Sequence, residues 1–205
     1  LVRGIDSSEQ MLKESQQFSN HRLPLNNDSN DNNSSDDARL PLQFQLKTIE
    51  AAIHEKTEWD LIFSNAAIQW VADHRTLLPG IITRLKKNGQ LVVQMPAQHH
   101  NITNHLLEQL ATADPFKHAM QDWTRGLHVL DISEYASILF ANGGAEITVF
   151  EKIYPVILKD VEGVYDWVSG TALLPYLERL SGDLLQSFIT QFKAALSREF
   201  PRSPV

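Results

Sequence analysis

The sequence predicts an α/β fold: a doubly wound, mainly parallel sheet with helices on both faces and a helical cover over the strand ends. The first observation is the order of elements, because apolar strand-like runs alternate with helix-like stretches over residues 1–95. The second is that these runs are continuously apolar, which is typical of parallel strands. The third is the change to helical periodicity after Pro96. Ligands of such sheets bind at the carboxyl ends of the strands.

The first half of the chain contains the predicted sheet. A short strand over residues 1–5 stops at Asp6, and Ser7 with Gln10 predicts a capping box for the helix that follows. Residues 26–37 are all Asn, Asp or Ser and predict a mobile loop. Strands are then predicted over 42–46, 60–64 and 90–95, and helices over 49–53 and 77–87. We expect the strand over 60–64 to be buried, and Asn88-Gly89 to end the second of these helices.

The second half is predicted to be mainly helical. Helices are expected over 102–113, 116–122, 133–142, 161–169, 171–180 and 183–199. Gly143-Gly144 stops the third of these, and a long strand is predicted over 145–158. We therefore expect an α/β core over 1–100, a helical insertion over 101–132, a return to the core over 133–158 and a helical cover over 159–205.

Composition limits the classes of function. A chain of 205 residues with 42% hydrophobic content can form one sizeable core. Its net charge of −7 disfavours a general attraction to nucleic acid or to an anionic membrane surface. The lack of cysteine excludes disulfides and cysteine nucleophiles and is compatible with a reducing compartment. Because no apolar run approaches the ~20 residues of a spanning helix and no signal-peptide pattern opens the sequence, we expect a cytoplasmic protein.

Three predicted strands are followed by residues that suit ligand binding: Asp6, the Thr48-Ile49 corner and Asn65-Ala66-Ala67. A carboxylate such as Asp6 can accept hydrogen bonds from both ribose hydroxyls of a nucleotide-like cofactor, or it can cap the next helix. Asn65 and two alanines leave the backbone open to a ligand, while Gln69 and Trp70 add an amide and a flat wall. The alternative is a packed corner in which Trp70 belongs to the core and Asn65 forms a turn.

Several stretches of the sequence resemble a known family. Gly4–Ser8 with Met11-Leu12, Asp60–Trp70 and Gly89–Pro96 resemble class I S-adenosylmethionine (SAM) dependent methyltransferases. Residues 94–96 and 165–176 are similar to the narrower family of trans-aconitate methyltransferases. The resemblance implies a Rossmann-like fold and the methylation of a carboxylate of a small organic acid, trans-aconitate. That family begins with a strand and a glycine-rich loop and ends on a strand, so we expect the first and last strands to lie outside this chain.

The resemblance also implies a SAM site and an acceptor site. SAM would contact Asp6, Ser7, Thr48, Ile49, Asn65, Ala66 and Ala67. Gln69 and Trp70 would face the acceptor. Because a carboxylate acceptor needs cations, Arg125 and Arg179, with His128 and Lys152, are further candidates, and Tyr154, Trp167 and Tyr176 could wall the pocket. Thr48 stands where the family usually has an acidic residue for the adenine amino group. Since a carboxylate acceptor is already ionised near neutral pH, we assign no catalytic residue.

Other interpretations of the sequence stay open. His99 and His100, with His105 nearby, suggest a metal site, but no carboxylate or cysteine pattern accompanies them. Adjacent histidines rarely chelate one zinc ion, so we predict no metal. The chain could also methylate a carrier-linked dicarboxylate, as in biotin synthesis, or be a non-catalytic binding protein with the same fold. We make no prediction about its oligomeric state.

Overall fold

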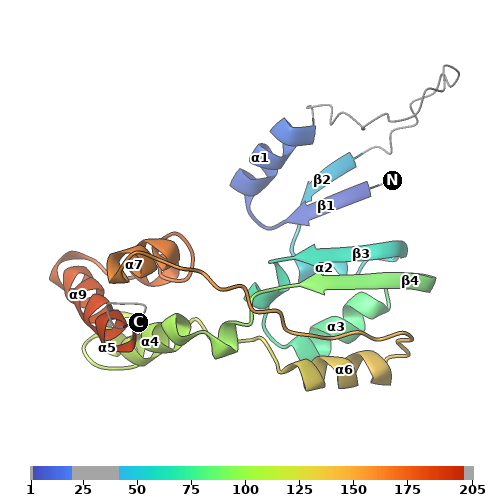
Figure 1. Cartoon of the computed structure of the whole chain (residues 1–205). Helices are drawn as coiled ribbons and strands as arrows, with labels where there is room; N and C mark the ends of the chain where they lie inside the picture. The colour runs from blue at the N-terminus through green and yellow to red at the C-terminus, as the bar shows by residue number, and fades with distance from the viewer. Residues whose placement is uncertain (1, 20–41, 201–205) are drawn as a thin grey trace, which may run out of the picture. The chain divides into compact units, whose positions relative to one another are not determined.

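The computed structural model describes residues 2–19 and 42–200 (Figure 1). The predicted loop over 26–37 lies outside the described residues. The chain divides into two compact units, Leu1–Phe63 with Pro79–Val92 and Ser64–Leu78 with Val93–Val205. Among the described residues, none of the helices has both the length and the apolar character needed to cross a membrane.

The first unit begins with a strand, a helix and a parallel strand. β1 (Val2–Asp6) and β2 (Leu42–Leu46) pair in parallel, with Val2 opposite Leu42 and Asp6 opposite Leu46. Between them along the chain lies α1 (Glu9–Ser19). A parallel pair with a helical connection is the elementary unit of an α/β sheet, as the sequence predicts.

The N-terminus of α1 differs from the predicted capping box. The Asp6 carboxylate accepts a hydrogen bond from the backbone N–H of Ser8 at 2.7 Å. This turn puts Ser8, and not Ser7, directly before the helix, where its hydroxyl accepts from the backbone N–H of Met11 at 3.3 Å. Gln10 instead donates to Glu14 within the helix at 3.2 Å. The predicted capping box is therefore wrong, although a serine does cap the helix.

A second strand, helix and strand follow the short helix α2 (Ile49–Ala52). They are β3 (Trp59–Asn65), α3 (His74–Ile82) and β4 (Leu85–Gln94). Figure 1 shows β3 and β4 side by side and pointing the same way. The backbone N–H of Trp59 donates to Arg84 near the start of both strands, and that of Ala66 donates to Gln94 at their ends, each at 2.8 Å. The two strands are therefore parallel.

The start of β4 corrects one prediction. Lys86 and Lys87, predicted to end a helix, lie within β4. Asn88 adopts a left-handed φ of 65°, and a Cβ on Gly89 would lie 3.0 Å from the carbonyl oxygen of Trp59. Because Asn tolerates that backbone conformation and Gly permits the close approach, this pair lies within a strand instead of ending a helix.

The burial of β3 also differs from expectation. Leu61 and Phe63 are 53% and 65% exposed, whereas the sequence predicts a buried strand. The two side chains are two residues apart and so share one face of the sheet. Among the described residues β3 pairs only with β4, and this pair leaves that face uncovered. The prediction of a buried strand is therefore wrong for this structure.

The second unit is largely helical and has a helix that overlaps each predicted range, although those predicted over 116–122 and 171–180 are only four residues long. Its helices are η1 (Ile68–Trp70), η2 (Gln98–His100), α4 (Ile102–Ala111), α5 (Phe116–Ala119), α6 (Ile132–Ala141), α7 (Val161–Ser169), α8 (Leu174–Leu177) and α9 (Gly182–Glu199). α9 packs against α4 and α7. The ring of Phe188 meets Phe116 edge-on at 5.0 Å and stacks on Tyr176 at 5.7 Å between centroids. These rings lie at the centre of the helical core.

The predicted strand over 145–158 is wrong. α6 ends as expected, because Gly143 takes a left-handed φ of 82° and the N–H of Gly144 donates to Leu139 at 2.9 Å. The residues that follow form no strand, and Ile153 and Ile157 are 84% and 91% exposed. A strand needs a neighbour for its backbone hydrogen bonds, and none of the strands in the described part of the chain pairs with this segment.

Candidate acceptor and cofactor site

The segment after β3 forms the bend that the sequence predicts. Ala66 has a left-handed φ of 49°, and its N–H is held by the carbonyl of Gln94 at the end of β4. Asn65 and Ala66 are exposed, and Ala67 directly precedes η1. Ile68 is 1% exposed and anchors the segment. The bend thus presents small residues and open backbone at the carboxyl ends of two parallel strands.

Gln69 is buried and Trp70 is exposed, whereas a packed corner would bury the tryptophan. Gln69 is 4% exposed, and its Oε1 atom has no hydrogen-bond partner within the described chain. Trp70 is 50% exposed, so it is not a core side chain. An unpaired buried amide oxygen destabilises a fold by about 1–3 kcal/mol. Gln69 is therefore a candidate acceptor for a ligand group, and Trp70 is a candidate wall.

Arg125 lies against Trp70, as a shared acceptor site requires. Its guanidinium carbon is 4.7 Å from the centroid of the Trp70 ring. One nitrogen, Nη1, donates to Oδ1 of Asn104 at 3.0 Å, whereas the buried Nε has no acceptor among the described residues. Burial lowers the pKa of Arg125, and the neighbouring Tyr176 and Glu108 oppose that shift. The result is a partly desolvated cation with a free donor beside an exposed ring.

Tyr176 and Arg179 continue this arrangement away from Trp70. The buried Tyr176 hydroxyl donates to Glu108 at 3.1 Å, and burial together with that carboxylate raises the pKa of the phenol. The Trp123 ring meets Tyr176 edge-on at 5.4 Å, and the Arg179 guanidinium lies 3.8 Å from the Trp123 centroid. Trp123 and Arg179 also line a surface hollow of about 340 Å³. We call Trp70, Arg125, Tyr176, Trp123 and Arg179 the arginine-aromatic row.

Tyr154 and Trp167, also predicted to bind the methyl acceptor, lie outside the row. Tyr154 is 69% exposed, and its ring contacts the ammonium of Lys152 at 4.7 Å. Trp167 is 63% exposed on α7. No contact within the described residues joins either side chain to the row. Conversely, the sequence offered no pattern that singles out Asn104, Glu108 or Trp123, because they act here through tertiary contacts.

The remaining cofactor candidates lie in the first unit. Asp6 is partly buried at the carboxyl end of β1, with one oxygen occupied by the Ser8 N–H, and Ser7 is exposed beside it. A carboxylate has a second oxygen, so the turn at Ser8 leaves Asp6 able to bind another donor. The Thr48 hydroxyl accepts from the N–H of Ala51 at 3.2 Å and caps α2, with Ile49 next to it. That hydroxyl keeps its own proton to donate.

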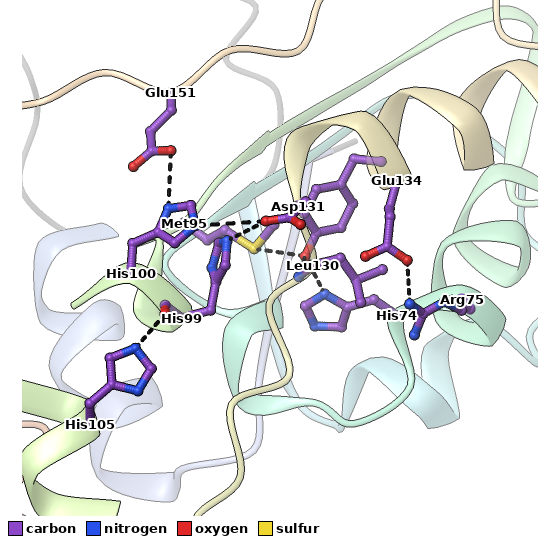
Figure 2. A network of polar contacts seen from close by, with 11 residues as sticks. His74, Arg75, Met95, His99, His100, His105, Leu130, Asp131, Glu134 and Glu151 are labelled. Atoms are coloured by element: carbon purple, nitrogen blue, oxygen red, sulfur yellow. Dashed lines mark hydrogen bonds and ion pairs between the residues drawn. The ribbon is translucent and has the colours of Figure 1, made fainter. Parts of the chain in front are cut away.

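A buried network next to η1 has no signal in the sequence. His74, at the start of α3 (Figure 2), is 1% exposed. Its Nδ1 lies 2.6 Å from the Tyr135 hydroxyl, and its Nε2 lies 2.8 Å from the carbonyl of Ile68. A carbonyl only accepts, so Nε2 carries the proton and Nδ1 accepts from Tyr135. Burial lowers the pKa of His74, although its bond to Ile68 opposes that shift. The network fixes the turn that carries Trp70.

The first part of the chain is similar to a known domain family. Residues 1–93 match a family described as "Methyltransferase domain". This match agrees with the resemblance to class I SAM-dependent methyltransferases and with a Rossmann-like α/β fold class. The two parallel strand, helix, strand units agree with that class.

Several curated proteins that are similar to this chain are named trans-aconitate 2-methyltransferase. That enzyme of Deinococcus radiodurans is 40% identical over 149 residues, which cover 70% of this chain and 57% of the relative. The Variovorax paradoxus enzyme is 32% identical over 166 residues, covering 80% of this chain and 63% of the relative. The Escherichia coli enzyme is 30% identical over 142 residues, covering 69% and 54%. The chain thus spans between half and two thirds of the length of these relatives.

Proposed function

We propose that the full-length protein transfers the methyl group of SAM to a carboxylate of a small organic acid, with trans-aconitate as the acceptor. The observation that carries this proposal is the position of Arg125. Its guanidinium lies on the exposed Trp70 ring and keeps a buried Nε without an acceptor in the described chain. Arginine binds carboxylates through two parallel hydrogen bonds, and such a bond gains strength where the cation is partly desolvated. The names of the relatives support the same acceptor.

The row suits an acceptor with more than one carboxylate. Arg125 and Arg179 lie at separate positions along it, each against an indole ring. A tricarboxylic acid needs several cations, and aromatic walls can hold its unsaturated carbon skeleton between them. We propose that Gln69, Trp70, Arg125, Tyr176 and Arg179 bind this acid and that Tyr154 and Trp167 line the rim.

The residues proposed to bind SAM follow the ends of strands. SAM, when bound, supplies a methyl group on a positively charged sulfur that needs no further activation. We propose that Asp6 binds its ribose hydroxyls, with Ser7, Thr48 and Ile49 nearby, and that Asn65, Ala66 and Ala67 contact its methionine end. The Asp6 carboxylate oxygen that has no partner among the described residues and the left-handed bend at Ala66 support these roles.

The chain's own residues contribute positioning. The acceptor carboxylate is ionised near neutral pH, so no general base is required. Arg125 and Trp70 would fix its orientation, and the packed helices of the second unit would exclude the water that weakens a carboxylate nucleophile. Holding the two reactants in line accounts for a large share of the rate in reactions of this kind.

We also propose roles for larger parts of the chain, a cellular location and a class of partner. Residues 1–100 would be the SAM-binding core and residues 159–205 the cover over the acceptor. Both small molecules are charged and cross a lipid bilayer poorly, which favours a cytoplasmic enzyme. The net charge of −7 favours small acids held in a local basic site over nucleic acid or membrane partners.

The experiment is a methyl-transfer assay on the full-length protein with labelled SAM and three acceptors: trans-aconitate, isocitrate and a malonyl carrier protein. We expect label in trans-aconitate alone. Label in the carrier would favour the alternative carboxyl methyltransferase. SAM binding without transfer to any of the three would favour a non-catalytic binding protein.

A further inference from the structure

Four side chains from three separate parts of the second unit form one cluster. Figure 2 shows His99 and His100 of η2 turned toward Asp131, with Glu151 on the other side of His100. The Nε2 atoms of His99 and His100 lie 3.2 Å and 3.7 Å from the same oxygen of Asp131. The Nδ1 of His100 lies 3.5 Å from Glu151. The carboxylates that the sequence pattern lacked are therefore supplied by the fold.

The side chain of Asp131 faces the two histidines and does not cap α6. It occupies the N-cap position of α6, where an aspartate normally accepts a hydrogen bond from the first turn of the helix. Its side chain makes no such bond and faces the two imidazoles instead. A side-chain cap contributes about 0.5–2 kcal/mol to helix stability, and α6 lacks this contribution from Asp131.

The spacing suits one transition-metal ion. Ligand atoms held about 2.0–2.1 Å from a tetrahedral zinc ion lie roughly 3.3–3.4 Å from one another. One ligand atom each of His99, His100 and Asp131 lies within 4.8 Å of the other two, and the two distances to Asp131 fall on either side of the ideal value. Small rotations of the half-exposed His100 and Asp131 side chains would close the set around an ion.

The neighbours of the two histidines resemble those of metal ligands. A metal-bound imidazole usually donates its other N–H to a carboxylate, which fixes the ring and increases its basicity. Glu151 stands in that position for His100. The backbone of His99 is also held, because its carbonyl accepts from His105 at 2.7 Å. The Nδ1 of His99 has no partner in the described chain, so we expect His100 to be the stronger ligand.

We propose that His99, His100 and Asp131 form a site for a divalent transition metal, with zinc as the best fit, and that Glu151 supports His100 from behind. Two imidazoles and one carboxylate leave the fourth tetrahedral position for water or an external ligand. The ion would join η2, the start of α6 and the segment around Glu151, which are separate along the chain. This inference does not depend on the proposed methyl transfer.

The test is calorimetric titration of ZnCl₂ into the full-length protein after it has been stripped with a chelator. We expect one zinc ion per chain. His100→Asn and Asp131→Asn should each weaken binding by at least about a hundredfold, and Glu151→Gln by about 10- to 100-fold. His118→Asn is the matched control, because His118 is exposed on α5 and should leave the affinity unchanged.

Two further measurements separate this site from surface histidines. Cobalt in place of zinc should give the visible absorption of a tetrahedral complex in the wild type and not in Asp131→Asn. Zinc should raise the unfolding temperature of the wild type but not of that variant, whose metal-free stability reports on its folding. Absence of saturable zinc binding, or equal affinity in the wild type and Asp131→Asn, would overturn the proposal.

Discussion

The Nδ1 atom of His74 lies 2.6 Å from the hydroxyl of Tyr135, a residue 61 positions further along the chain. The same hydroxyl accepts from the backbone N–H of Leu130 at 3.0 Å. Through Nε2 the imidazole also holds the carbonyl of Ile68. One buried pair therefore connects α3 and α6 to the turn that presents Trp70.

Removal of the Tyr135 hydroxyl should destabilise the protein. Tyr135→Phe leaves both the Leu130 N–H and the His74 Nδ1 without a partner, which we expect to cost about 1–3 kcal/mol of unfolding free energy. Urea titration followed by circular dichroism measures this. Tyr154→Phe is the control, since that exposed hydroxyl should contribute almost nothing. Equal stability of the two variants would show that the hydrogen bonds of the Tyr135 hydroxyl do not stabilise the fold.

The stability should also depend on pH through His74. Burial lowers the pKa of His74 in the folded state, so the unfolded chain binds the proton more readily. The stabilisation is then complete above the ordinary histidine pKa of about 6.5 and is lost as the pH falls below it. Unfolding free energies at several pH values should show a smaller loss for His74→Gln than for the wild type. Parallel curves would contradict the assignment of a neutral His74.

The helices could be predicted because their signals are local. The apolar spacing of Leu77, Leu78 and Ile81 identifies α3, and all three are buried. The glycines at 143 and 144 end α6 through their own backbone. The strand over 42–46 agrees with β2 residue for residue.

Features that depend on distant partners could not be predicted. Residues 145–158 alternate like a strand, but a strand exists only where another one accepts its hydrogen bonds. Asn88-Gly89 suits a helix end, but in the structure it lies within β4, where the Trp59 carbonyl of the neighbouring strand lies close to Gly89. Within the candidate site, Trp70 was proposed from the resemblance and Arg125 from the chemistry of a carboxylate acceptor, whereas their contact is a result of the fold.

The helical core should be sensitive to loss of its central ring. Phe188 is completely buried between Phe116 and Tyr176, so Phe188→Ala creates a cavity and should cost about 3–5 kcal/mol. Thermal or urea unfolding measures the loss. Phe140→Ala removes the same side chain from a position that is 77% exposed and should have little effect. A small loss for Phe188→Ala would mean that the second unit is loosely packed.

Asp6 should matter for the cofactor and little for the fold. Asp6→Asn keeps an oxygen for the Ser8 N–H but loses the charge and the second acceptor that would bind the ribose. We expect about a 10- to 100-fold loss of SAM affinity by calorimetry, since hydrogen bonds to charged groups contribute about 1.5–3 kcal/mol. Asp183→Asn, at an exposed position in the first turn of α9, is the control. Unchanged affinity in Asp6→Asn would remove Asp6 from the site.

The most direct test of the account is the kinetics of trans-aconitate methylation by Arg125→Lys and Arg125→Gln at saturating SAM, with Arg198→Gln on the exposed end of α9 as control. Lysine keeps the charge but lacks the fork, so we expect the acceptor KM to rise about tenfold for Arg125→Lys and about a hundredfold for Arg125→Gln. SAM affinity should stay constant in all three variants. An acceptor KM equal to that of the wild type in Arg125→Gln would contradict the assignment of the acceptor site to Trp70 and Arg125.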